Sequence, residues 1–309
     1  MSGPPPPLPS NLVVFGPEAN CTLELCPLEY SLYRYRPNLA VNALFLALFA
    51  LAAVVHTFLG VRWRAWGFMA FMIAGCLSEI AGYIGRIIMY YNPFQFAGFM
   101  LQIIFITSAP VYFTAAIYVT IGRAIDSFAP ELSRIPTKAM YWLFISFDVF
   151  CLVLQAAGGA LSTTSAGSST VGVDLAMAGL VLQVVVLVAF CAVFADYMVR
   201  YTRSAFARPL TGRERLFFGF LALAVVLILV RCAYRVDELS EGYKQSEKLS
   251  NEGLFIGLEG VLIICAVFSL CVGHPGLVFA KSKDTADDVR KKPSVDSGIE
   301  SCATQMEQK

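Results

Sequence analysis

Charged and amide side chains recur inside long apolar stretches of this 309-residue chain. A charge near the centre of a membrane-spanning helix costs about 2.5–3.5 kcal/mol on insertion scales, so we expect such residues to carry function. Three carboxylates and three guanidinium groups occupy such positions, and three glutamines accompany them. The resulting candidates for substrate binding or translocation are Glu79, Arg86, Gln102, Asp148, Gln155, Gln183, Arg231, Arg235 and Glu259.

The spacing of these candidates along the chain indicates which of them share a helix face. Glu79 and Arg86 are seven residues apart, which is two helical turns, and small residues lie between them. Asp148 and Gln155 have the same separation. Two interpretations remain open: an internal network that fixes helix packing, or a polar cavity between helices. We favour the cavity, because apolar packing would be less costly than six buried charges.

The residue types suit the binding of a charged amphiphile. A carboxylate at Glu79 or Glu259 can pair with an ammonium headgroup. Guanidinium groups at Arg86, Arg231 and Arg235 can balance these carboxylates in an empty site or hold a phosphate. The chemistry that these side chains predict is therefore recognition of a headgroup by charge.

Membrane-spanning helices must position these side chains. A bilayer core of about 30 Å requires about 20 helical residues, and only internally hydrogen-bonded backbone is stable there. The sequence is 57% hydrophobic and 15% charged, and its mean hydropathy is +0.66. We therefore predict an all-α integral membrane protein with seven transmembrane helices between two tails, 1–38 and 273–309. The predicted spans are 39–61, 66–90, 97–122, 139–161, 171–199, 215–235 and 253–272. Pro110 lies inside the third span and is expected to kink it.

The distribution of lysine and arginine predicts the orientation of these spans. Sixteen of these residues lie on the side of the membrane that holds the C-terminal tail, and four lie on the other side. Basic residues favour the cytosolic side, so the N-terminus is expected outside and the C-terminus in the cytosol. The plasma membrane is the expected location. A net charge of +1 gives no support for a nucleic-acid partner.

The N-terminal tail has two features that fit an extracellular location. Asn20-Cys21-Thr22 matches the acceptor pattern for N-glycosylation. Cys21 and Cys26 are the cysteines of the predicted external segments, and they either form a short disulfide or remain free thiols. The first ten residues lack a basic start followed by an apolar core, so no cleaved signal peptide is expected.

Several motifs, taken in their order along the chain, resemble those of a known family. They are Glu79…Gly82-Tyr83…Arg86, Ala109-Pro110, Ala115-Ala116, Tyr118, Asp148…Gln155…Gly158-Gly159, Gly179…Gln183, Arg231…Tyr234-Arg235…Glu238 and Glu259. From about Arg36 to about Phe279 this set is similar to the fungal lipid-translocating exporter family, also called RTA-like proteins. The resemblance implies a seven-span membrane protein linked to lipid asymmetry, release of sphingoid long-chain bases and drug resistance. Membrane lipids or amphiphilic small molecules, including phospholipids and sterol-like compounds, are therefore the expected partners.

Other seven-span classes fit the sequence less well. Retinal proteins need a lysine in the last span, and the predicted spans contain none. Zinc-dependent hydrolases need about three histidine ligands, whereas this chain has only two histidines, His56 and His274. His56 lies near the end of a span, where we expect it to be solvated. No Gly-Lys pair is present to bind the phosphates of ATP. We therefore predict a transporter rather than an enzyme, without metal or cofactor. The alternative is a sensor or receptor that signals an amphiphile to a cytosolic partner.

The C-terminal tail from Lys281 to Lys309 is polar and charged, and it is expected to be disordered. Residues 296–301 resemble a D-S-G-x-x-S phosphodegron, in which phosphates on Ser297 and Ser301 would be read by a ubiquitin ligase. The alternative is an inert, solvated tail.

Overall fold

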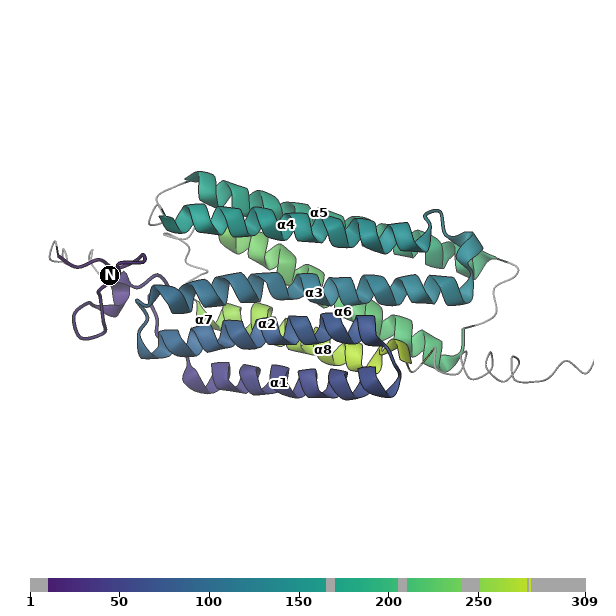
Figure 1. Ribbon diagram of the computed structural model, residues 1–309, viewed down its shortest axis with the longest axis horizontal. Helices are drawn as coiled ribbons and strands as arrows, with labels where there is room; N and C mark the ends of the chain where they lie inside the picture. The colour runs from purple at the N-terminus through teal and green to yellow at the C-terminus, as the bar shows by residue number, and fades with distance from the viewer. Residues whose placement is uncertain (1–10, 165–169, 205–209, 241–250, 277, 279–309) are drawn as a thin grey trace, which may run out of the picture.

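The computed structural model describes residues 11–164, 170–204, 210–240, 251–276 and 278. Within these ranges the apolar stretches form long helices that lie side by side in one elongated bundle (Figure 1). Seven of the described helical segments are long and apolar enough to cross a membrane. Residues 11–38 lie at one end of the bundle, which we call the N-terminal end (Figure 1).

The seven predicted spans are confirmed as helices. The first six are α1 (Leu39–Arg62), α2 (Trp66–Tyr91), α3 (Phe96–Phe128), α4 (Thr137–Thr164), α5 (Thr170–Arg203) and α6 (Gly212–Ser240). The seventh span consists of α7 (Glu252–Leu254), the π-helical turn η3 (Phe255–Val261) and α8 (Leu262–Val272). Two short 3-10 helices, η1 (Leu28–Tyr30) and η2 (Pro130–Leu132), lie outside the spans. Several helices extend past their predicted ends, because backbone hydrogen bonding continues where hydropathy falls.

Glycines allow close contact between neighbouring helices, as is common in membranes. A Cβ atom on Gly85 of α2 would lie 2.7 Å from the carbonyl oxygen of Gly98 in α3. A Cβ atom on Gly158 of α4 would lie 2.6 Å from the carbonyl oxygen of Gly172 in α5. The bundle therefore contains two closely packed helix pairs, α2 with α3 and α4 with α5.

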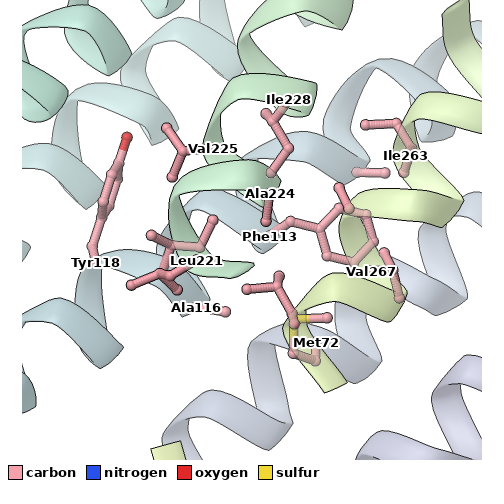
Figure 2. Close-up of a cluster of buried hydrophobic side chains, with 14 of the residues drawn as sticks. Met72, Phe113, Ala116, Tyr118, Leu221, Ala224, Val225, Ile228, Ile263 and Val267 are labelled. Atoms are coloured by element: carbon pink, nitrogen blue, oxygen red, sulfur yellow. The ribbon is translucent and has the colours of Figure 1, made fainter. Parts of the chain in front are cut away.

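Apolar side chains from α2, α3, α6 and α8 fill the centre of the bundle (Figure 2). Met72, Phe113, Leu221 and Val267 are each at most 1% exposed. Apolar side chains on the outer face of α1 are instead accessible, with Phe58 at 67% exposure. An apolar outer surface over a packed centre suits a bundle surrounded by lipid.

The N-terminal segment packs onto the ends of α2 and α3. The ring of Phe15 lies 5.6 Å from the ring of Phe96 and 5.4 Å from that of Phe99. A disulfide joins Cys21 to Cys26, whose Cα atoms are 5.7 Å apart. Aromatic contacts hold the segment against the bundle, and the disulfide closes a short loop within the segment.

Of the three predicted modification sites, the structure describes one. Asn20 is exposed, and its side-chain Nδ2 donates a hydrogen bond to the carbonyl oxygen of Asn11 at 3.0 Å. Ser297 and Ser301 lie outside the described residues, as does the rest of the predicted tail beyond residue 278. Glycosylation and phosphorylation at these positions both stay predictions.

Candidate functional site

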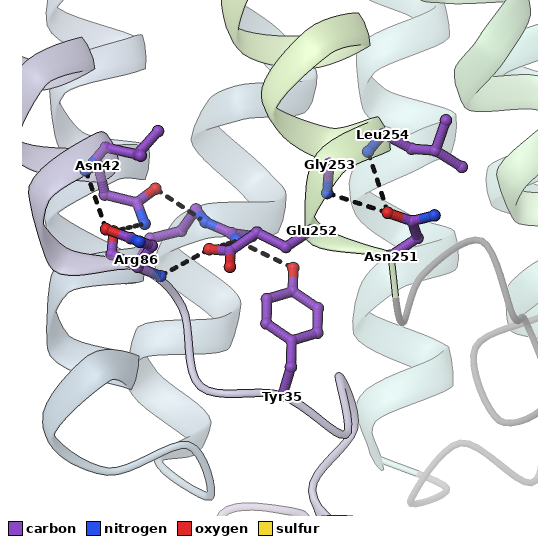
Figure 3. Close-up of polar contacts among 9 residues, drawn as sticks. Tyr35, Asn42, Arg86, Asn251, Glu252, Gly253 and Leu254 are labelled. Carbon is purple, nitrogen blue, oxygen red and sulfur yellow. Dashed lines mark hydrogen bonds and ion pairs between the residues drawn. The ribbon is translucent and has the colours of Figure 1, made fainter.

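Arg86 of α2 is fully buried. Figure 3 shows its side chain among those of Asn42, Tyr35 and Glu252. Its Nε donates a hydrogen bond to Oδ1 of Asn42 in α1 at 3.0 Å, and its Nη2 donates to the hydroxyl of Tyr35 at 2.9 Å. Oε1 of Glu252 in α7 lies 3.8 Å from the same Nη2. The guanidinium carbon also lies 3.7 Å from the centre of the Phe255 ring. Arg86 thus joins the N-terminal segment, α1 and the seventh span.

Two further contacts strengthen this junction. Oε1 of Glu252 accepts a hydrogen bond from the backbone N–H of Asn38 at 2.6 Å. The Asn38 side chain caps the start of α1 by accepting from the N–H of Val41 at 3.3 Å. Burial raises the pKa of the Tyr35 hydroxyl, although the neighbouring Arg86 lowers it. Tyr35 therefore stays neutral and accepts the Arg86 hydrogen bond as a phenol.

A second cluster of charges lies between α6 and the seventh span. Nη1 of Arg235 lies 2.5 Å from Oε2 of Glu238 and 3.3 Å from Oε1 of Glu259. Nη2 of Arg231 lies 4.0 Å from Oε2 of Glu259. All four side chains are at least nine-tenths buried. Arg235 thus connects the C-terminal part of α6 to the carboxylate of Glu259 in the π-helical turn.

Glu79 of α2 faces this second cluster and is fully buried. It interacts electrostatically with Arg231 and Glu259, but neither of its oxygens has a hydrogen-bond partner among the described residues. With Glu79 included, three carboxylates face the two guanidinium groups of Arg231 and Arg235. The carboxylates of this cluster therefore outnumber its guanidinium groups by one, a charge that a proton or a cationic group would balance.

Pro110 explains why Arg231 is bound inside an apolar helix bundle. Proline has no backbone N–H, so the carbonyl oxygen of Ile106, four residues earlier in α3, loses its usual partner. Nη2 of Arg231 donates a hydrogen bond to this oxygen at 2.6 Å. The helix continues through Pro110 from Phe96 to Phe128. The freed carbonyl thus becomes a binding point for a charged side chain.

The remaining candidates make local contacts between helices. Oδ2 of Asp148 in α4 accepts a hydrogen bond from the Thr114 hydroxyl of α3 at 3.0 Å. Gln155 of α4 donates through Nε2 to Oε1 of Gln183 in α5 at 2.9 Å. Gln102 of α3 is buried, and its Oε1 has no partner among the described residues. Asp148 and Gln155 therefore face different neighbours despite their shared spacing.

A cavity of about 360 Å³ lies between α3, α4, α5 and α6, toward the N-terminal end. Most of its lining is apolar, and two of the candidates, Gln155 and Arg235, contribute to it. Glu79, Arg86 and Glu259 are not part of the lining. This cavity therefore does not bring the candidates together. Five of the charged candidates belong instead to the two clusters described above, and Arg235 links one of these clusters to the apolar cavity.

Sequence reasoning missed several partners in these clusters. Tyr35, Asn42 and Glu252 bind Arg86, yet none was a candidate. Asn42 lies just inside the first span, where a buried amide is itself a usable signal. Glu252 lies at the start of the seventh span, and its polar neighbours in the sequence gave no sign of its role.

The expectation that His56 is solvated is wrong, because its side chain is fully buried. Its Nε2 lies 3.2 Å from the carbonyl oxygen of Val267 in α8. His274, just past α8, is also fully buried and packs its ring against Trp63 and Phe68. Burial, with His56 nearby, lowers the pKa of His274 to about 4. Helix packing at the end of the bundle opposite residues 11–38 therefore keeps His274 neutral.

A bundle of seven apolar helices with paired charges in its centre defines a polytopic membrane protein. Residues 72–282 match the family described as "RTA1 like protein". This match covers more than half of the chain, and the chain therefore belongs to the RTA1-like family, as its motifs indicated. No solved structure matches the chain.

Curated yeast proteins are similar to this chain along most of its membrane portion. The sphingoid long-chain base transporter RSB1 of Saccharomyces cerevisiae (strain Lalvin EC1118) is 29% identical over 289 residues, covering 81% of this chain and 74% of the relative. Protein RTM1 is 32% identical over 205 residues, which is 64% of each chain. Protoporphyrin uptake protein 1 is 30% identical over 205 residues, covering 64% of this chain and 66% of the relative. Two of these relatives are named for the transport of sphingoid long-chain bases and for the uptake of protoporphyrin.

Proposed function

We propose that this protein translocates amphiphilic lipids or toxic amphiphiles across a membrane, and that sphingoid long-chain bases are among its substrates. Membership of the RTA1-like family supports this proposal, as does the similarity to a yeast protein named as a sphingoid long-chain base transporter. The seven apolar helices place the chain in a membrane, where such substrates are dissolved.

The observation that carries the proposal is the unequal charge of the buried cluster. Three carboxylates there face two guanidinium groups, and Glu79 has no hydrogen bond among the described residues. An unpaired buried carboxylate is costly, and a cationic headgroup would relieve that cost. In this mechanism Glu79 or Glu259 pairs with the ammonium group, while Arg231 and Arg235 hold the carboxylates together when the site is empty.

The distribution of basic residues supports an orientation of the protein in the membrane. This orientation determines in which half of the membrane the charged clusters lie. Sixteen lysines and arginines against four favour a cytosolic C-terminus, with residues 11–38 outside. The cavity and both clusters would then lie toward the outer half of the membrane. We propose the plasma membrane as the location, where a substrate released from the outer half leaves the cell.

Lipid flux through the purified chain in liposomes tests the proposal. The assay compares a labelled long-chain amine, a labelled phospholipid and a labelled long-chain alcohol, without any other protein. We expect flux above that of empty liposomes, greatest for the amine because it is the cation among the three. Absence of flux for every headgroup, with the protein folded and binding the amine, would contradict translocation and favour a sensor.

A further inference from the structure

The cavity between α3, α4, α5 and α6 is lined by side chains that suit an alkyl chain. Its volume of about 360 Å³ lies near the lower end of the usual range for small-molecule sites, roughly 300–1,000 Å³. Apolar side chains such as Met100 of α3, Leu152 of α4 and Leu180 of α5 contribute to its wall. A pocket of this size and composition fits one chain rather than two.

Two polar residues of the wall, Thr107 of α3 and Gln155 of α4, each hold an enclosed oxygen without a partner among the described residues. These atoms are Oγ1 of Thr107 and Oε1 of Gln155, and each can turn toward an occupant by rotation of its side chain. The Gln155 side chain is 9% exposed, and its other end donates to Gln183. Buried polar atoms without partners are costly. A hydroxyl group both donates and accepts, so it can satisfy a threonine hydroxyl and either orientation of a glutamine amide.

The charge around the cavity disfavours an ionic headgroup. Among the described lining residues Arg235 alone is charged, and its guanidinium already faces Glu238 and Glu259. A cation in the cavity would meet this guanidinium without a carboxylate in the wall. An anion would have to compete with two carboxylates that Arg235 already binds. An uncharged headgroup avoids both costs.

The cavity opens toward the side of the bundle. Ile104 of α3 is 53% exposed, and Ala156 of α4 is also exposed, although both line the cavity. At the N-terminal end, Phe96 belongs to the wall and packs against Phe15 of the N-terminal segment. The exposed wall residues on α3 and α4 therefore point to entry of an occupant between these two helices, from the hydrocarbon.

From these observations we propose that the cavity binds a single-chain amphiphile with an uncharged hydroxyl headgroup, which enters laterally from the bilayer. The hydroxyl is bound between Thr107 and Gln155, and the chain lies along the apolar wall. This inference rests on the proposed function, because it assigns a class of amphiphile to the cavity beside the charged clusters.

A photoactivatable long-chain alcohol, with a diazirine in its chain, tests the site in vesicles that contain the purified protein. We expect the label on peptides of α3 and α4 that include Met100 and Leu152. The variant Gly159→Leu fills the cavity, because Gly159 lines it and a Cβ there meets nothing within 4 Å. The control is Gly219→Leu in α6, where a Cβ also meets nothing within 4 Å and no cavity residue changes.

Gly159→Leu should reduce labelling of these peptides by about tenfold or more, while Gly219→Leu should leave it unchanged. Unlabelled alcohol should compete with the probe about fivefold better than an alkyl trimethylammonium or alkyl sulfate of equal length. Equal labelling in both leucine variants, or equal competition by the cation, would overturn the inference. Lipid flux without labelling of the cavity would overturn this inference alone, and labelling without flux would overturn the proposed function alone.

Discussion

Glu79 differs from the other buried charges in having no hydrogen bond among the described residues. Each core arginine instead has an acceptor: Asn42 for Arg86, a backbone carbonyl for Arg231 and Glu259 for Arg235. A carboxylate retained only for packing would be expected to have comparable partners. The absence of such a partner at Glu79 among the described residues therefore favours a role in binding, in which the substrate supplies the partner.

Replacing Glu79 with glutamine should separate binding from stability. The variant Glu79→Gln keeps the shape of the side chain and removes its charge, so we expect the free energy of unfolding to stay the same or rise, because an unpaired buried carboxylate is costly. Translocation of a long-chain amine should fall by about tenfold or more, because the ammonium loses its counter-charge. Thermal unfolding and liposome flux measure the two effects.

Asp174→Asn is the matched control, since Asp174 lies exposed near the N-terminal end of α5. It should leave both stability and flux unchanged. Normal flux in a well-folded double variant, Glu79→Gln with Glu259→Gln, would exclude carboxylates from the mechanism.

The sequence predicted the burial of the nine candidates, although not that of His56 or Asn42, and it could not predict their partners. Burial follows from the length and composition of each apolar stretch, whereas a partner depends on how each helix is rotated. Arg231 is an example, because its acceptor is the Ile106 carbonyl that Pro110 leaves free. From the sequence, Pro110 could be predicted to kink the helix. Only the structure showed that the carbonyl oxygen it leaves free accepts a hydrogen bond from Arg231.

Among the helices, the seventh span has a local geometry that hydropathy does not reveal. Residues Phe255–Val261 form a π-helical turn that includes Glu259. Such turns are rare and often occur at functional sites. Gly260 lies in the turn against α1, where a Cβ would come within 2.5 Å of the Phe45 ring. The π-helical turn changes the direction in which the side chains of the span point, but it leaves the apolar composition of the span unchanged. Hydropathy therefore predicts the span and does not reveal the turn.

The adjacent glycines of α4 give a test of helix packing. A Cβ at Gly158 would approach backbone atoms of α5, whereas a Cβ at Gly159 meets nothing within 4 Å. Gly158→Ala should therefore lower the free energy of unfolding by about 1–3 kcal/mol. Gly159→Ala should leave it unchanged or raise it by about 0.5–1 kcal/mol, because alanine restricts the unfolded chain. Thermal unfolding in detergent measures both, and equal destabilisation would contradict the packing of α4 on α5.

Across the bundle, the two ends differ in the groups that lie there. The end beside residues 11–38 carries a disulfide and the aromatic contacts of Phe15. At the opposite end, Asp196 lies between Arg134 and Arg200, with Nε to Oδ2 distances of 3.2 and 3.0 Å. These surface pairs reduce the net positive charge at that end only partly. The excess of basic residues there is therefore available to set the orientation.

Accessibility of the two termini tests the proposed orientation. Asn20 should be glycosylated if residues 11–38 face the outside or the lumen, and Asn20→Gln should abolish the resulting mass shift. Asn11→Gln is the control, because Asn11-Leu12-Val13 is not an acceptor sequence. A C-terminal tag should resist protease added to intact cells and become sensitive after permeabilisation. Digestion of that tag on intact cells would show that the orientation is the reverse of the proposed one. The cavity would then open toward the cytosolic leaflet and take its amphiphile from that leaflet.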